Sequence, residues 1–192
     1  MSYFKKGINK RSALFKATLS LVNKDGIQGA SMANVASMAN VLPATIYLYF
    51  DNKHDLVNRL YLDLRESFAK HAFNGYDVDY CIKDSFEKIW FNMTDFKLNQ
   101  KEKASFLSQC DNTPMVDEQT RQEGLKYLAP LFELWDKGKQ EGILKQMSPY
   151  LMYAFTIYPI AFMINMDNRN LCSLCDITIK GSYNAAWHNI RI

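Results

Sequence analysis

Glycine and proline are scarce in this chain of 192 residues, which has 8 glycines and 5 prolines. Average proteins contain about 12% of the two residues together, so this chain has roughly half of the usual supply of turn residues. We therefore expect few turns and long helices. Hydrophobic residues make up 48% of the chain and charged residues 22%, a balance that excludes an intrinsically disordered protein.

Signals for secretion, disulfide formation and catalysis are also lacking. The N-terminus MSYFKKGINKR has basic residues without an apolar segment after them, which predicts a cytoplasmic protein. The four cysteines follow no signal peptide and do not form a disulfide scaffold. No Gly-rich phosphate loop, HExxH or GxSxG motif is present. We therefore expect no catalytic residue, no metal and no cofactor, and a function other than that of an enzyme.

Residues 149–166 form an uncharged and largely apolar segment, which approaches the length that a transmembrane helix needs. Pro159 inside the segment and Asp167 after it argue against a membrane span. A helix that is apolar all round is otherwise buried, either in a core or in a subunit interface. We therefore expect no membrane partner.

Apolar residues recur at helical spacing along the chain, and no strand pair or internal repeat is visible. Leu56, Leu60, Leu64 and Phe68, for example, fall on one line. Thr113 and Ser148 each precede a proline and are predicted N-caps. The fold class is predicted to be all-α, with about nine helices. The first ends near Gly26, and the others cover roughly 31–39, 43–50, 52–73, 77–98, 101–110, 115–140, 149–166 and 170–188.

The first three of these helices are predicted to form a helix-turn-helix unit. Ser31 can cap the second helix, Asn40 tolerates the left-handed backbone of a tight turn, and Pro43 suits the first position of the third helix. A third helix over 43–50, anchored by Ile46 and Phe50, would fit the major groove of DNA.

Charge is distributed unevenly in this chain of net charge +3. Residues 1–60 carry a net charge of +5 and residues 61–192 a net charge of −2. A basic N-terminal segment is typical of a surface that faces nucleic acid. Lys5, Lys6, Lys10 and Arg11 fit either an arm along the DNA backbone or a solvated tail.

The segment from Ser31 to Leu56 resembles the DNA-binding domain of the tetracycline-repressor (TetR/AcrR) family. That family has a Thr or Ser cap, an Ile/Val-Ala pair, Ala-Gly-Val-Ser, then a small residue and Thr-hydrophobic-Tyr-x-Tyr/His-Phe-x-x-Lys-x-x-Leu. The likeness covers about fifty residues, from the first helix into the fourth. The matching residues are Ser31, Val35, Ala36, Ala39, Val41, Ala44, Thr45, Ile46, Tyr47, Tyr49, Phe50, Lys53 and Leu56.

Two departures from the family pattern lie in the turn. Asn40 replaces the usual Gly, and both residues tolerate a positive φ. Leu42 and Pro43 replace a Ser that is often followed by another polar residue. Because Leu cannot accept hydrogen bonds from the helix start, we expect a weaker cap and one fewer contact with the DNA backbone.

The resemblance implies phosphate contacts for Thr45, Tyr47 and Lys53. Leu48 and Tyr49 are placed to face DNA, and Leu48 suits an apolar contact with a thymine methyl group. The resemblance also implies a helix-turn-helix domain over 1–55 and a helical ligand-binding and dimerisation domain over 56–192. The predicted residues for binding a double-stranded DNA operator are Ser31, Pro43, Ala44, Thr45, Tyr47, Leu48, Tyr49 and Lys53.

The C-terminal part is rich in large apolar side chains, which suit a small apolar or aromatic effector of unknown identity. The resemblance implies a homodimer that dimerises through the helices 149–166 and 170–188. A two-fold dimer predicts a palindromic operator, from which the effector releases the protein. Candidate effector-binding residues are Trp90, Met93, Phe106, Gln109, Tyr127, Trp135, Phe155 and Thr156.

Three alternatives to a repressor stay open on the sequence alone. Leu42 and Pro43 are the only support for a small-molecule-binding protein with a degraded DNA-binding unit. Cys172 and Cys175 form a CxxC pair, and we expect these residues to be buried thiols on one helix. If the pair instead changes its redox state, the protein would be a thiol-based redox sensor. An activator would have the same sequence features as a repressor.

Overall fold

The protein is all-α in a computed structural model, which describes residues 2–111 and 114–192, with side chains for 10–110 and 114–192. Across these residues there is no named strand, and a single isolated bridge joins Leu144 to Arg191. No helix among them is both long and apolar enough to cross a bilayer. Eleven helices are described: α1 (Ser2–Gly29), α2 (Met32–Met38), α3 (Pro43–Ile46), α4 (Lys53–Ala72), α5 (Ile82–Asn99), α6 (Lys101–Asp111), α7 (Glu118–Lys126), α8 (Ala129–Gln140), α9 (Pro149–Thr156), α10 (Tyr158–Asn168) and α11 (Asp176–Ile190).

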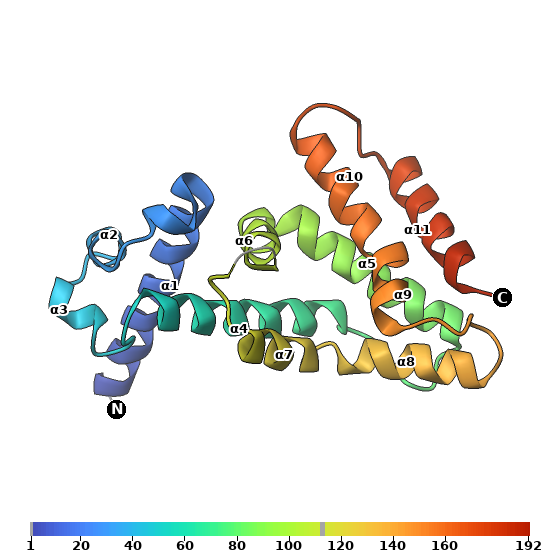
Figure 1. Ribbon diagram of the computed structural model, residues 1–192, viewed down its shortest axis with the longest axis horizontal. Coiled ribbons are helices and arrows are strands. Elements are labelled where there is room, and N and C mark those ends of the chain that lie inside the picture. Colours follow the sequence, from blue (N-terminus) through green and yellow to red (C-terminus); the bar gives the residue numbers. More distant parts are fainter. Residues whose placement is uncertain (1, 112–113) are drawn as a thin grey trace. The chain divides into compact units, whose positions relative to one another are not determined.

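The chain divides into two compact units whose helices are labelled in Figure 1. The first consists of Met1–Glu66 and Lys101–Leu125, and the second of Ser67–Gln100 and Lys126–Ile192. The helix-turn-helix segment therefore lies wholly within the first unit.

The core of the first unit forms where α1 packs against α2 and α6. Leu14 and Val22 of α1 are completely buried, as are Val35 and Ala36 of α2. The ring of Phe15 lies 5.4 Å, centroid to centroid, from that of Phe50, just after α3. These contacts position the helix-turn-helix on α1.

The start of α4 completes this core, since Leu56 and Leu60 are buried. Leu64, in the same unit, and Phe68, in the second unit, are buried too, so the predicted apolar line along this helix is confirmed.

The second unit is built around α5, which contacts α8, α10 and α11. Its predicted inward residues Ile82, Phe86, Ile89, Trp90 and Met93 are all buried. The indole Nε1 of Trp90 donates a hydrogen bond of 2.9 Å to the Thr156 carbonyl oxygen at the end of α9. A buried polar group is thereby satisfied inside an otherwise apolar core.

Two long helices predicted from the sequence are each divided in the structure. Instead of one helix over 115–140, α7 ends at Lys126 and α8 begins at Ala129. Instead of one over 149–166, α9 ends at Thr156 and α10 begins at Tyr158. Pro130 and Pro159 lie in the first turns of α8 and α10, where their missing N–H groups cost no helical hydrogen bond. A proline inside a helical pattern therefore marks a new helix here.

The structure confirms one predicted cap and moves the start of the last helix. Ser148 caps α9 as predicted, with its Oγ accepting from the Leu151 amide at 3.2 Å. Thr113 lies outside the described residues. Gly26 interrupts α1 with a φ of 71°, close to the predicted end of that helix. The last helix was predicted to begin near residue 170 but starts at Asp176.

Candidate nucleic-acid interface

Helix α2 begins at a side-chain cap, as predicted. Ser31 has an extended backbone, and its Oγ accepts a hydrogen bond of 3.2 Å from the amide of Asn34. The Asn34 side chain in turn donates to the Gly29 carbonyl oxygen at 3.1 Å. The cap therefore fixes the direction in which the chain leaves α1 and enters α2.

The turn between α2 and α3 depends on Asn40, whose φ is 53°. This left-handed conformation was predicted for Asn40, and it allows the Val41 amide to donate to the Ala36 carbonyl oxygen at 3.0 Å. Leu42 then occupies the N-cap of α3 without a side-chain hydrogen bond, and Pro43 lies in its first turn. The weaker cap expected at Leu42 is thus confirmed.

Helix α3 is shorter than predicted, because it ends at Ile46 rather than Phe50. Residues 47–49 continue as a turn in which Leu48 donates to Thr45 and Tyr49 donates to Ile46, at 3.1 and 3.0 Å. Bonds between residues three apart wind the chain more tightly than an α-helix. The predicted recognition helix of eight residues is therefore one α-helical turn followed by a tighter turn.

The α3 segment has one buried and one exposed side. Ile46 and Phe50 are buried and attach the segment to the core of the first unit, as predicted. Tyr47 and Leu48 are 58% and 81% exposed. Of the other predicted DNA-binding residues, Pro43 and Ala44 are exposed, whereas Ser31, Thr45, Tyr49 and Lys53 are half-buried.

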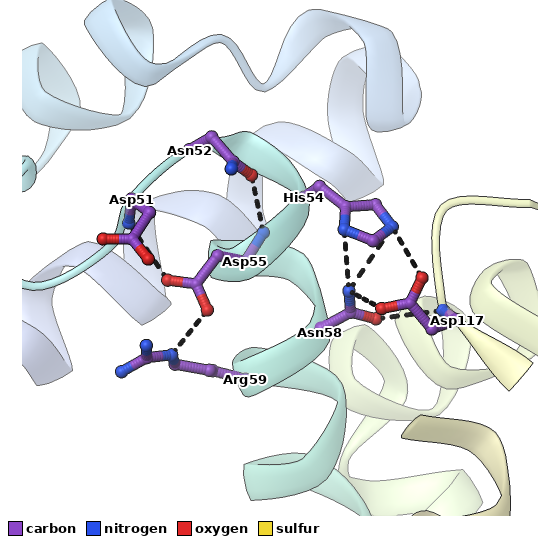
Figure 2. Close-up of polar contacts among 7 residues, drawn as sticks. All are labelled: Asp51, Asn52, His54, Asp55, Asn58, Arg59 and Asp117. Carbon is purple, nitrogen blue, oxygen red and sulfur yellow. Dashed lines mark hydrogen bonds and ion pairs between the residues drawn. The ribbon is translucent and has the colours of Figure 1, made fainter. Parts of the chain in front are cut away.

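The beginning of α4 is held by a reciprocal cap, which Figure 2 shows. The Asn52 side chain accepts a hydrogen bond from the Asp55 amide at 2.9 Å, and the Asp55 carboxylate accepts one from the Asp51 amide at 3.0 Å. The second oxygen of Asp55 pairs with Arg59 at 2.7 Å. The ammonium group of Lys53 donates to the Gln28 carbonyl oxygen at 3.3 Å, which links α4 to the end of α1.

A second cluster in Figure 2 joins α4 to the residue before α7 within the same unit. The Asn58 amide donates to the Asp117 carboxylate at 3.0 Å and to His54 Nδ1 at 3.1 Å, and its oxygen accepts from the Asp117 backbone N–H at 3.2 Å. Because Nδ1 accepts, the hydrogen of neutral His54 lies on Nε2, 3.1 Å from the Asp117 carboxylate. No sequence motif identified these residues, because 59 positions separate Asn58 from Asp117.

Of the N-terminal basic residues, Arg11 lies over the Phe15 ring, 4.8 Å from its centroid. The side chain of Lys10 is exposed. The side chains of Lys5 and Lys6 lie outside the described residues.

The residues predicted to bind an effector do not form one group. Trp90, Met93, Trp135 and Thr156 are buried in the second unit, where Phe155 is exposed and Tyr127 is half-buried. Phe106 is buried and Gln109 is half-buried in the first unit. The structure directly joins Trp90 to Thr156 through their hydrogen bond.

The two cysteines of the CxxC pair are not buried on one helix, which corrects the prediction. Cys175 is exposed and forms the N-cap of α11, and Cys172 is half-buried in the preceding loop. Hydrogen bonds from the Thr178 hydroxyl and from backbone amides lower the pKa of the Cys175 thiol. Both thiols are free.

Comparisons with known proteins agree with this helix-turn-helix geometry. A family model described as bacterial regulatory proteins, tetR family, matches residues 14–60. A second, the tetracyclin repressor-like C-terminal domain, matches residues 81–191, which is more than half of the chain. The chain belongs to the TetR family.

Among curated proteins, this TetR-family chain is 29% identical over 101 residues to an uncharacterized HTH-type transcriptional regulator from Haemophilus influenzae. That match covers 53% of this chain and 54% of the relative, so the chain aligns with only about half of the curated relative's length.

Among solved structures, a TetR-family transcription regulator from Marinobacter aquaeolei VT8 has a TM-score of 0.90 at 20% identity, covering 97% of this chain and 98% of that one. A TetR-family regulator from Haemophilus influenzae RD has a TM-score of 0.83 at 19% identity, covering 97% and 99%. At these identities the likeness establishes the fold.

Proposed function

We propose that this TetR-family protein is a DNA-binding transcriptional regulator, a repressor that a small apolar or aromatic effector releases from a palindromic operator. The observation that carries the proposal is the α3 segment, where Tyr47 and Leu48 are exposed while Ile46 and Phe50 hold the backbone to the core. Exposed apolar side chains on a firmly attached short segment suit contacts with base edges and thymine methyl groups. The regulators among its relatives favour this function over a carrier or a redox sensor.

The contacts with the operator divide into two kinds. Leu48, Tyr49 and Ala44 would meet base edges, whereas the hydroxyl groups of Thr45 and Tyr47 would donate to phosphates. Lys53 keeps two N–H donors beyond its bond to the Gln28 carbonyl, and these would meet a phosphate beside the start of α4. Ser31 and Pro43 act by fixing the starts of α2 and α3. The net charge of +5 on residues 1–60 attracts the DNA backbone.

Dimerisation is proposed through the segments 149–166 and 170–188. Exposed apolar side chains gather on these segments, which a monomer would leave in water. They include Tyr150, Leu151, Phe155, Tyr158, Phe162, Leu171 and Ile177. A two-fold dimer presents two α3 segments to half-sites about 34–36 Å apart.

The division of labour proposed for the chain is DNA binding by residues 1–55 and effector binding with dimerisation by 56–192. An effector acts by preferring the dimer state that does not fit the operator. A coupling of about 1–3 kcal/mol would lower operator affinity 5–150-fold. Equal operator affinity for effector-bound and free protein would contradict this release mechanism.

The experiment that tests DNA binding selects sequences from a random duplex pool with the purified protein and then measures affinities by fluorescence anisotropy at two salt concentrations. We expect a palindromic site bound about 10³-fold or more above scrambled DNA. Leu48→Ala should weaken binding to the selected site by about tenfold, since a lost base contact costs about 1–3 kcal/mol. Lys53→Gln should lower the slope of log affinity against log salt by about one.

Val78→Ala is the matched control, because Val78 is an exposed aliphatic residue in the second unit, outside the proposed interface. Its affinity for the selected site should equal that of the wild type. A pool that yields no preferred sequence would overturn the proposed function, and equal losses for Leu48→Ala and Val78→Ala would overturn the assignment of α3.

A further inference from the structure

A groove with a volume of about 720 Å³ lies in the second unit between α5, α11 and the loop after α8. Pockets that bind small molecules commonly have volumes of about 300–1,000 Å³. None of the eight residues predicted to bind the effector lines this groove. We infer that the groove is a separate binding site for a small organic anion with an aromatic body.

The aromatic preference follows from three side chains of the lining, Phe91, Tyr183 and Trp187. The rings of Phe91 and Tyr183 are 5.4 Å apart, centroid to centroid. Tyr183 and Trp187 are only 5% and 8% exposed, so the core holds them in place. The half-buried Phe91 ring and the accessible edges of Tyr183 and Trp187 offer a flat apolar ligand a fixed contact surface without a loss of side-chain entropy.

The preference for an anion follows from the charged residues that line the same groove. Lys83, Lys180 and Arg191 are cationic, and Glu87 is the one acidic side chain in the lining. Within the described part of the chain, none of the three cations forms a salt bridge with a carboxylate. The cations would outnumber the acids even if Ile192 carries a free carboxylate. An anionic group in the groove would therefore gain attraction without breaking an existing ion pair.

The hydroxyl group of Tyr183 is a second polar group that can recognise a ligand in the groove. It is buried and makes no hydrogen bond of good geometry with any described residue. Burial, the charge of the nearby Glu87 carboxylate and a side-chain contact with that carboxylate raise the pKa of Tyr183, so the hydroxyl keeps its proton and remains a donor. A ligand oxygen reaching into the groove would give this buried donor an acceptor with the hydrogen-bond geometry that its contact with Glu87 lacks.

The experiment uses isothermal titration calorimetry of the full chain with two probes of the same shape, 1-naphthaleneacetate and its neutral amide, 1-naphthaleneacetamide. We expect the anion to bind at least tenfold more tightly than the amide. The double variant Lys180→Gln/Arg191→Gln should lower the affinity for the anion at least tenfold and leave the affinity for the amide unchanged. Both residues are exposed in the single chain, and Lys180 lies in the segment 170–188 that is proposed for dimerisation. Circular dichroism therefore checks the fold of the double variant, and size-exclusion chromatography checks that its oligomeric state equals that of the wild type.

Lys126→Gln is the matched control, since Lys126 is exposed on α7 and does not line the groove. It should bind both probes as the wild type does. The inference is overturned if the anion and the amide bind equally, if the double variant binds the anion as tightly as the wild type, or if the anion shows no saturable binding at about 1 mM. No DNA is present in this experiment, so its result is independent of the proposed function.

Discussion

Replacing Asn58 with Ala removes three hydrogen bonds, of which two hold α4 to Asp117, the residue before α7, and one joins Asn58 to His54 within α4. The side chain is only 8% exposed, and its amide bonds to the Asp117 carboxylate, to the Asp117 backbone N–H and to His54. A hydrogen bond contributes about 0.5–1.5 kcal/mol net, and more when one partner is charged. Three of them sum to about 2–6 kcal/mol, but His54 and Asp117 are half exposed, so water replaces part of what is lost.

We therefore expect Asn58→Ala to lower the free energy of unfolding by about 2 kcal/mol. His54→Ala removes a half-exposed pair with Asp117 and one hydrogen bond with Asn58, and should cost about 1 kcal/mol, less than Asn58→Ala. The assay is urea denaturation followed by circular dichroism, at one protein concentration because association affects stability. A smaller loss for Asn58→Ala than for His54→Ala would refute this account of the cluster.

Three further predictions concern stability. Gly138→Ala should lower the free energy of unfolding by about 1–3 kcal/mol, because the added Cβ would lie 2.6 Å from Leu144 Cδ1. Gly181→Ala on α11 is the control, because its Cβ meets no atom within 4 Å, and it should raise the free energy of unfolding by about 0.5–1 kcal/mol. Equal melting temperatures for the two variants would contradict this. Asn40→Val should destabilise by about 1–2 kcal/mol in urea denaturation, since a β-branched residue is strained at a φ of 53°, and an unchanged midpoint would contradict it. Because the pKa of Tyr183 is raised, the unfolded chain loses the hydroxyl proton near pH 10 while the folded protein keeps it. The free energy of unfolding should therefore fall between pH 9 and 11 more steeply in the wild type than in Tyr183→Phe. Parallel curves of this free energy against pH would refute the prediction.

Local signals in the sequence were sufficient to predict the helix-turn-helix. Ser31, Asn40 and Pro43 each act on the backbone within a few residues, and each has the predicted cap, turn or first-turn role. The buried positions Ile46 and Phe50 followed from helical spacing. These features were predictable because their physical causes lie within one turn of the chain.

Helix ends were harder to predict. The α-helix at α3 stops at Ile46 although no Gly or Pro follows, and the next residues tighten into a turn that still places Phe50 in the core. Pro130, by contrast, indicates the start of a new helix, but the continuous helical periodicity of 115–140 led us to predict a single helix there. The end of α3 has no local signal in the sequence, whereas the division between α7 and α8 coincides with the missing backbone N–H of Pro130.

Features that join distant segments could not be predicted. Asn58 and Asp117 are 59 positions apart, and Lys83 reaches the same groove as Lys180 and Arg191 only because α5 and α11 are neighbours. Spacing along one helix carries no information about such pairs.

The missing side-chain cap at Leu42 has a consequence for the dynamics of α3. A good N-cap is worth about 1 kcal/mol relative to an apolar residue, which corresponds to about a fivefold larger population of locally opened molecules. The amide of Leu48, bonded to Thr45, should therefore exchange its hydrogen with solvent about five times faster than in Leu42→Ser. Ordering this segment on DNA makes the net free energy of binding less favourable in the wild type, whereas the segment is already ordered in the Ser variant. Leu42→Ser should therefore bind its operator more tightly.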